Sequence, residues 1–274
     1  TVVLFLSSIP FPVWRKILGE LSDSGTHSQG ALIVGPTAVG KSDLALDVAK
    51  DLNGHIVNAD SVQVYKAVDI GTAKPTAEQR TLLPHHLFDF VEPPREYTAG
   101  QYLQDFSNKL GNLPKDAPIF VVGGSGFYVR ALEFGMYSVP EISKEVRKRL
   151  DETQGQVELD KLFDEIQLRD PQYAQKISRN DHYRIKRAWG LMETSQKTMT
   201  EIQNEFSSLP RKAEFRPQVK VGLYLERDQL ATRVESRVQK MLTEGFIQEV
   251  EGLLAEGLRD WAPLKSIGYK EIVE

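Results

Sequence analysis

Hydrophobic residues follow two patterns along this chain. Short apolar runs without alternation stand at residues 31–35, 55–60, 118–124 and 219–225. This pattern is typical of strands that are buried on both faces. Apolar residues at helical spacing follow the first run over residues 41–52, and a further helix is expected around residues 100–110. Strands that alternate with helices predict a parallel sheet with helices on both faces.

Residues 140–212 have a different composition. They are rich in charged and helix-forming residues and contain no convincing strand. We therefore predict an all-helical domain, residues 140–212, inserted into an α/β core made of residues 31–139 and 213–274. Residues 1–30 are interpreted as an N-terminal extension or linker of unknown role. A helix is also expected after residue 225, with Arg233, Arg237 and Lys240 on one face.

The first candidate for chemistry is the segment GPTAVGKS, which follows the first apolar run and precedes a helix. It matches the phosphate-loop pattern G-x-x-x-x-G-K-[S/T] in the required strand–loop–helix context. Backbone N–H groups and the helix N-terminus attract phosphate oxygens, a lysine adds positive charge, and a serine hydroxyl suits Mg²⁺. The pattern predicts a P-loop NTPase-like fold and a phosphate site formed by Gly35, Thr37, Ala38, Val39, Gly40, Lys41 and Ser42.

Two absences narrow the reaction class. The apolar run at residues 118–124 ends in glycines and Ser125 rather than in the acidic residue that motor and switch proteins use for Mg²⁺. Residues 108–111 (NKLG) lack the aspartate of a guanine-reading motif. These features disfavour motor and switch proteins and leave the transfer of a group between small molecules.

Asp60 is the second candidate, because it ends a predicted parallel strand, where ligands bind in such sheets. Its carboxylate is interpreted as a general base, a Mg²⁺ ligand or a helix N-cap. Lys74 either reaches a phosphate or ends a loop before Pro75. His85 and His86 resemble a metal pair, but neighbours on an extended chain point apart, so no transition-metal site is expected.

Composition adds constraints on location and partners. The 274 residues include no cysteine, which excludes disulfides, thiolate zinc sites and cysteine nucleophiles and fits a cytoplasmic protein. The apolar stretch at residues 1–14 is too short for a membrane helix, and no membrane association is expected. The net charge of −4 means that a nucleic acid would need a local basic surface. Residues 176–187 offer one, with five Lys or Arg against one Asp, unless they form an ordinary solvated helix face.

Several longer segments resemble one known family. The segments are GPTAVGKS, DSVQVYKAVDIGTAKP, PHHLFD, VVGGSGFYVRAL, RNDHYRIKRAW and LKSIGYKE. Their order and spacing are similar to those of the tRNA dimethylallyltransferases, also called tRNA isopentenyltransferases, from about residue 31 to residue 270. The resemblance implies transfer of the dimethylallyl group of dimethylallyl diphosphate to N6 of the adenosine adjacent to the tRNA anticodon. Pyrophosphate is released.

The resemblance also implies roles for individual residues. Lys41 would bind the diphosphate and Ser42 would hold Mg²⁺, while Asp60 would accept the N6 proton as general base. Ser125 stands where the family usually has threonine and retains a hydroxyl for the diphosphate. Arg227 matches a family arginine on the diphosphate. The implied contacts to the target nucleotide and the tRNA involve Asp60, Ser61, Val62, Gln63, Ser125, Arg147, Tyr183, Arg184, Lys186 and Arg187.

Two other activities remain open at this point. A relative of the cytokinin type would prenylate free AMP, ADP or ATP, and a P-loop kinase would transfer phosphate from ATP. The helical insertion and the DIGTAKP segment favour the tRNA branch. We expect a monomer that uses Mg²⁺, dimethylallyl diphosphate and a tRNA anticodon stem-loop.

Overall fold

The structure is a computed structural model, and it describes residues 2–6, 30–115, 117–136, 141–153, 155–207 and 213–274. The chain divides into two compact units. The core unit comprises Thr1–Gly135 and Ala213–Glu274, and the helical unit comprises Met136–Lys212. The predicted domain boundaries at residues 140 and 212 lie outside the described residues.

The core unit contains a parallel sheet of six strands in the order β1-β6-β2-β5-β3-β4. The strands are β1 (Val2–Leu6), β2 (Gly30–Val34), β3 (His55–Asn58), β4 (His85–His86), β5 (Ile119–Gly123) and β6 (Val219–Leu223). The predicted buried runs correspond to β2, β3, β5 and β6, which form the centre of the sheet. The prediction of a parallel sheet flanked by helices is confirmed.

Both edge strands were missed by the sequence analysis. Val2–Leu6 lies in the segment interpreted as an extension or linker, yet its backbone pairs with β6, with Val2 opposite Val219. The apolar run VVLFL therefore extends the sheet, and residues 7–29 of that segment lie outside the described residues. At the other edge, His85 and His86 pair with β3 over only two residues, too short a run to show a strand pattern.

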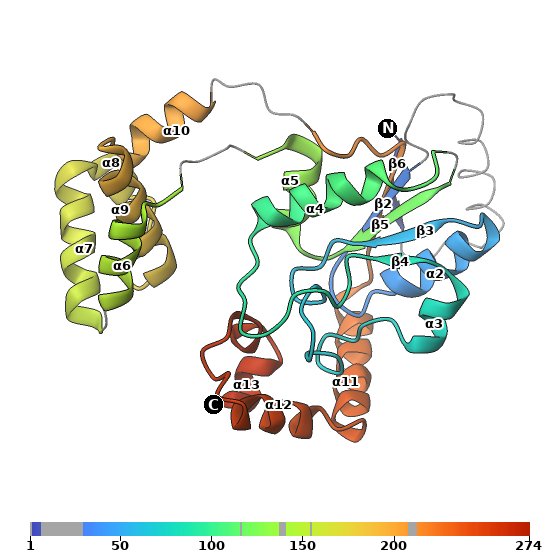
Figure 1. Cartoon of the computed structure of the whole chain (residues 1–274). Coiled ribbons are helices and arrows are strands. Elements are labelled where there is room, and N and C mark those ends of the chain that lie inside the picture. Colours follow the sequence, from blue (N-terminus) through green and yellow to red (C-terminus); the bar gives the residue numbers. More distant parts are fainter. Residues whose placement is uncertain (1, 7–29, 116, 137–140, 154, 208–212) are drawn as a thin grey trace. The chain divides into compact units, whose positions relative to one another are not determined.

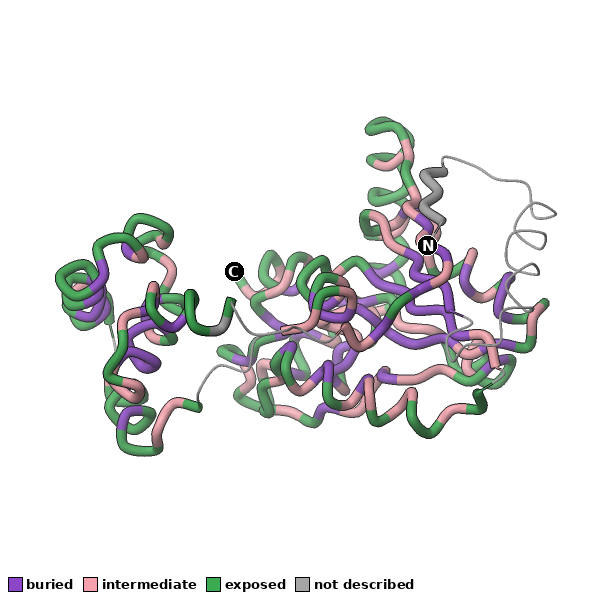
Figure 2. The backbone as a smooth tube through the Cα atoms, turned by 90° about the horizontal axis from the view of Figure 1, so that it is seen from above, coloured by how far each residue is buried: buried purple, intermediate pink, exposed green. Residues whose placement is uncertain are grey.

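Helices lie on both sides of the sheet (Figure 1). The helices of the core unit are α2 (Lys41–Asp51), α3 (Ala77–Leu82), α4 (Ala99–Gly111), α5 (Gly126–Phe134), α11 (Arg227–Thr243), α12 (Phe246–Ala255), the short 3₁₀ helix η2 (Ala262–Lys265) and α13 (Tyr269–Val273). On one face, Ala45 and Val48 of α2 pack against residues such as Ile33 and Phe120. Figure 2 shows the central strands as mostly buried, and in β2, β3 and β5 this is what the unalternating sequence runs predict, whereas β6 alternates between buried and half-buried residues.

Helix α4 contacts the end of β3, and helix α5 leads into the insertion. The hydroxyl of Tyr102 on α4 donates to the carbonyl of Asn58 at the end of β3, at 2.8 Å. After α5 the chain leaves for the helical unit, and it returns where Glu214 and Phe215 donate their backbone N–H groups to the carbonyl of Leu132, at 2.9 and 3.1 Å. The two ends of the insertion are therefore bonded to each other within the core unit.

The described part of the helical unit contains helices and no strand, as predicted for this segment. They are α6 (Lys144–Glu152), α7 (Gln156–Arg169), α8 (Pro171–Ala174), α9 (His182–Ser195) and α10 (Met199–Ser207). Ile166, Ile185 and Trp189 belong to its separate hydrophobic core. The buried carboxylate of Asp170 accepts from the N–H of Tyr173 at 3.0 Å and from the N–H of Thr200 at 2.7 Å. This carboxylate links α8 to α10.

Candidate functional site

The phosphate loop lies between β2 and α2. Gly40 immediately precedes α2 with φ of 99°, a left-handed conformation that glycine adopts at little cost, and Ala38 has φ of 65°. This backbone turns the loop so that α2 begins at Lys41, with its N-terminal N–H groups at the carboxyl end of β2. The ammonium of Lys41 donates to the carbonyl of Pro36 at 2.8 Å. The loop therefore has the geometry of an anion site.

A cavity opens beside this loop at the carboxyl edge of the sheet. Its polar wall combines groups from the phosphate loop, the turn after β3, the loop that follows it, and α11: Thr37, Lys41, Ser42, Asp60, Gln63, Thr72 and Arg237. An apolar part of the wall comes from α2 and the strands, with Ala45, Leu46, Ile56, Phe88 and Val122. Parallel strands bring these distant segments to one edge, as expected for an open α/β sheet. The cavity presents cations, one carboxylate and an apolar surface to the same ligand.

Asp60 is held in a tight turn after β3. The side chain of Asn58, fully buried, accepts from the N–H of Asp60 at 2.9 Å and donates to its carbonyl at 3.0 Å. The Oδ1 atom of Asp60 accepts from the N–H of Val62 at 2.9 Å and of Gln63 at 3.4 Å. No helix follows in the described residues 61–76, so the helix N-cap interpretation of Asp60 is wrong. The carboxylate caps a turn that fixes it at the cavity wall.

Lys41, Asp60 and Arg237 interact electrostatically in this cavity. Burial lowers the pKa of Lys41, with Asp60 opposing the shift and Arg237 adding to it. Burial also lowers the pKa of Arg237, and Asp60 again opposes the shift. Two cations that are partly desolvated and repel one another gain most from an anionic ligand, whose charge both of them attract. The site is therefore prepared for a multiply charged anion such as a diphosphate.

Ser125 lies beside the Asp60 turn rather than in the wall of the cavity. Its Oγ accepts from the N–H of Ser61 at 2.8 Å and donates to the Ser61 hydroxyl at 3.0 Å. The close approach depends on Gly123, where a Cβ atom would lie 2.1 Å from the carbonyl oxygen of Ala59. The ends of β3 and β5 are thus packed backbone to backbone, and Ser125 is linked to the turn that carries Asp60.

Arg237 is the main wall residue that the sequence analysis did not propose. Its guanidinium donates to the carbonyl of Thr72 at 3.3 Å, and the neighbouring Arg233 donates to the carbonyl of Val39 at 3.3 Å. Both belong to the basic face noted on the helix after residue 225, and that face was the available signal. Arg227, the predicted diphosphate ligand, is exposed at the first position of α11 and is not part of the cavity wall.

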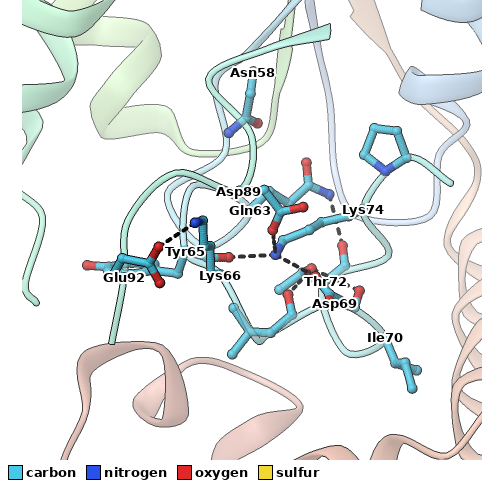
Figure 3. A network of polar contacts seen from close by, with 12 residues as sticks. Asn58, Gln63, Tyr65, Lys66, Asp69, Ile70, Thr72, Lys74, Asp89 and Glu92 are labelled. Atoms are coloured by element: carbon cyan, nitrogen blue, oxygen red, sulfur yellow. Dashed lines mark hydrogen bonds and ion pairs between the residues drawn. The ribbon is translucent and has the colours of Figure 1, made fainter. Parts of the chain in front are cut away.

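Lys74 has a structural role, which decides between its two interpretations. Its side chain is 3% exposed, and its ammonium donates to the carbonyl of Tyr65 at 2.5 Å, to Asp69 at 2.7 Å and to Asp89. An ammonium has three protons to donate. Figure 3 shows Lys74 at the centre of this network, with the donors and acceptors around it. Lys74 therefore holds the loop together and is not a phosphate ligand.

Comparison with known protein families decides the identity of this arrangement. A family model described as "IPP transferase" matches residues 63–274, and one described as "Isopentenyl transferase" matches residues 29–83. The chain belongs to the IPP transferase family. The resemblance seen in the sequence is thereby confirmed.

Individual members of the IPP transferase family are similar over most of their length. A tRNA dimethylallyltransferase of Bdellovibrio bacteriovorus is 48% identical over 246 residues, which cover 88% of this chain and 79% of the relative. Among solved structures, the full-length tRNA isopentenylpyrophosphate transferase of Bacillus halodurans has a TM-score of 0.60 at 31% identity, over 90% of this chain and 76% of that one. A eukaryotic dimethylallyltransferase acting on tRNA has a TM-score of 0.67 at 27% identity, over 82% and 56%.

The two adjacent histidines point apart in this IPP transferase, as expected. His85 lines the cavity, whereas Nε2 of His86 lies 2.8 Å from Nδ1 of His55, and these two rings stack. Burial and then the neighbouring His55 lower the pKa of His86 to about 4. Among the described residues there is no group of three histidine, cysteine or acidic side chains that could hold a metal ion.

The helical unit displays most of the candidate tRNA residues at its surface. Tyr183 is 69% exposed, and Arg147 and Arg187 are exposed as well. Arg184 pairs with Asp181 at 2.7 Å. Lys186 differs from the others, because its ammonium donates to the carbonyls of Leu150 at 3.1 Å and Thr153 at 2.8 Å at the end of α6. Its contact with tRNA stays a prediction, and it has a structural role besides.

Within the described ranges, no helix is both long and apolar enough to span a bilayer.

Proposed function

We propose that this chain transfers the dimethylallyl group of dimethylallyl diphosphate to N6 of the adenosine adjacent to a tRNA anticodon and releases pyrophosphate. It is an enzyme of the prenyltransferase class, as its relatives named tRNA dimethylallyltransferase are. The observation that carries the proposal is the cavity that Asp60 shares with the cations Lys41 and Arg237. An allylic diphosphate needs the two cations, and an adenosine amine needs the carboxylate as acceptor of its proton.

Each of these groups has a role in a single displacement step. The bond between C1 of the dimethylallyl group and the diphosphate oxygen breaks, and its electron pair leaves with the diphosphate. The N6 amine of adenosine forms the new C–N bond, and its proton passes to the carboxylate of Asp60. Lys41 and Arg237 stabilise the charge that develops on the leaving diphosphate, because they are fixed and partly desolvated before the reaction.

The apolar wall suits the other half of the donor. Leu46, Ile56, Phe88 and Val122 line the same cavity as the phosphate loop, and they would cover a short branched alkenyl chain. A hydrocarbon wall also keeps water away from the allylic carbon while its bond to oxygen breaks. This match between an apolar wall and a hydrocarbon donor favours prenyl transfer over a kinase reaction.

We assign Mg²⁺ to this site as the divalent cation. The described residues provide the Ser42 hydroxyl at the phosphate loop and no acidic cluster. That donor set fits Mg²⁺, which at phosphate loops takes the Ser or Thr hydroxyl as a ligand and otherwise coordinates phosphate oxygens and water. When bound, the cation offsets part of the diphosphate charge.

The helical unit is proposed as the clamp for the anticodon stem-loop. Exposed Arg147, Tyr183 and Arg187 provide phosphate contacts and a ring on which a base can stack. Asp60, Ser61, Val62 and Gln63, with Ser125, are proposed to hold the target nucleotide in the core unit. The adenosine has to leave its stack before N6 reaches Asp60. We also propose that the enzyme acts in the cytoplasm and as a monomer.

The decisive experiment is a transfer assay with labelled dimethylallyl diphosphate and Mg²⁺. An anticodon stem-loop that bears the adenosine is offered as acceptor, with AMP and ATP in parallel reactions. Label on the RNA is the expected result. Label on free nucleotide alone would identify a cytokinin-type enzyme instead. Transfer of phosphate from ATP, with no use of dimethylallyl diphosphate, would identify a kinase.

A further inference from the structure

Glu249 on α12 binds the backbone of the loop that begins at Asp69. Its Oε2 atom accepts from the N–H groups of Asp69 and Ile70, both at 2.8 Å, and its Oε1 atom accepts from the N–H of Gly71 at 3.3 Å. Three consecutive backbone donors thus converge on one carboxylate. Hydrogen bonds to a charged acceptor are roughly twice as strong as neutral ones. The sequence separation of about 180 residues makes this a tertiary anchor and not a local turn.

Tyr269 on α13 completes the anchor. Its hydroxyl donates to Oε1 of Glu249 at 2.5 Å, and burial together with this hydrogen bond raises the pKa of Tyr269, so the phenol keeps its proton. The rings of Phe246 and Tyr269 pack on the loop so closely that a Cβ on Gly71 would lie 2.1 Å from one and 2.6 Å from the other. The glycine of the DIGTAKP segment is explained by this contact with the C-terminal helices.

The next residue of the loop connects the anchor to the cavity. The carbonyl of Thr72 accepts from the side-chain amide of Gln63 at 2.9 Å and from the guanidinium of Arg237 at 3.3 Å. Figure 3 shows the side-chain amide of Gln63 pointing toward the Thr72 carbonyl. One backbone oxygen therefore orients a proposed nucleotide-binding side chain and a proposed diphosphate-binding side chain.

From these contacts we infer that Glu249 and Tyr269 are positioning residues for the transfer reaction. They fix the N–H groups of residues 69–71 and thereby the Thr72 carbonyl, which holds Gln63 and Arg237 toward the cavity. Neither residue is part of the cavity wall. The assignment of a role in catalysis rests on the proposed function, whereas the anchoring itself does not.

Glu249→Gln is the principal test, with Tyr269→Phe as the milder variant. The glutamine removes the charge and one acceptor oxygen, and the phenylalanine removes only the hydroxyl while the ring packing remains. Glu251→Gln is the matched control, since Glu251 is an exposed carboxylate on the same helix. Hydrogen exchange at the N–H groups of residues 69–71 should accelerate about tenfold in Glu249→Gln, less in Tyr269→Phe, and not in Glu251→Gln.

Kinetics then separate positioning from general stability. In Glu249→Gln, kcat/KM for the anticodon stem-loop should fall by about 10- to 100-fold, since small displacements of substrate-positioning groups have effects of this size. When Glu249→Gln is introduced into the Gln63→Ala variant, the additional loss of kcat/KM should be smaller, because Glu249 acts partly through Gln63. A lower unfolding temperature with unchanged kcat/KM would show a merely structural role, and losses that simply multiply in the double variant would show that Glu249 does not act through Gln63.

Pyrophosphate titration keeps this inference separate from the proposed function. If the natural chain transfers no prenyl group, yet Glu249→Gln still weakens pyrophosphate binding and accelerates exchange at residues 69–71, the proposed function fails, while the anchoring of the loop and its effect on anion binding stand. Unchanged exchange in Glu249→Gln would overturn the inference whatever the activity. If Glu249→Gln does not fold, the same exchange and kinetic comparisons are decided with Tyr269→Phe.

Discussion

The core unit and the helical unit use their charged side chains in opposite ways. In the core unit, Lys41, Asp60 and Arg237 come from three distant segments and meet, partly buried, at one cavity. In the helical unit, Arg147 and Arg187 are exposed at the surface of α6 and α9. Burial strengthens charge–charge interactions in the first case, and solvent and salt weaken them in the second. We therefore expect large, specific effects of substitution in the core unit and small, graded effects in the helical unit.

The largest effect should come from Asp60. Asp60→Asn keeps an acceptor for the turn after β3 but removes the base, and kcat should fall by about 10²- to 10⁴-fold. Asp60→Ala should lower turnover at least as severely. Dimethylallyl diphosphate binding, measured by titration calorimetry, should remain nearly unchanged, since Asp60 is not needed to attract an anion. Asp47→Asn, on the exposed side of α2, is the control. An equal loss of binding and turnover would make Asp60 a metal ligand or a structural residue.

The next effect distinguishes two arginines of the core unit. Arg237→Ala should weaken pyrophosphate binding by about 10- to 100-fold, the value of one or two charge-assisted hydrogen bonds. Arg227→Ala should weaken it only a few-fold, because Arg227 is exposed and outside the cavity wall. Titration of both variants with pyrophosphate at one ionic strength is the measurement. A larger loss in Arg227→Ala would support the assignment made from the sequence.

The helical unit should respond more weakly. Arg187→Ala is expected to lower stem-loop affinity a few-fold and to reduce the slope of log K against log salt by about one. Lys186→Ala should instead destabilise this unit by about 1 kcal/mol, because it removes the donor to the carbonyls at the end of α6. Filter binding at several salt concentrations, with thermal unfolding of each variant, separates the two effects. A salt slope unchanged in Arg187→Ala would argue against a phosphate contact.

The smallest effect concerns the pH dependence of folding in the core unit. The pKa of His86 is lowered from 6.5 to about 4, so between these values the unfolded chain binds a proton that the folded chain does not. The free energy of unfolding should therefore fall as the pH is lowered from about 6.5 to about 4. At this half-exposed position the change is on the order of 1 kcal/mol. In His86→Gln the dependence should be shallower, as urea titrations at several pH values would show. If the free energy of unfolding depends on pH equally in His86→Gln and in the natural chain, His86 is not the group responsible.

The sequence predicted the parts of the molecule that local pattern determines. Buried strands and the phosphate loop have short, recognisable signatures, and Asp60 could be proposed because it follows such a strand. Arg237 was not proposed, since its contact with Thr72 depends on how α11 packs against a distant loop. The strand at Val2–Leu6 was missed for the same reason, because an edge strand is defined by its partner.

Two lysines show most clearly what could not be predicted from the sequence. Lys74 and Lys186 carry a charge and lie in segments associated with phosphate or RNA, so sequence alone favours an anion as ligand or leaves it open. In the structure their ammonium groups bind acceptors of the chain itself, with Asp69 among those of Lys74 and the Thr153 carbonyl among those of Lys186. Whether a lysine serves the fold or a ligand depends on acceptors brought close by tertiary structure.

The hydrogen bonds of Glu214 and Phe215 to the carbonyl of Leu132 have an evolutionary consequence. Both ends of the insertion are hydrogen-bonded at a single backbone oxygen. For the sheet, residues 136–212 are therefore equivalent to a long loop whose two ends are fixed close together. Changes in the length of such a loop cost little folding free energy. The length and sequence of the helical unit can therefore change among relatives while the geometry of the cavity in the core unit is retained.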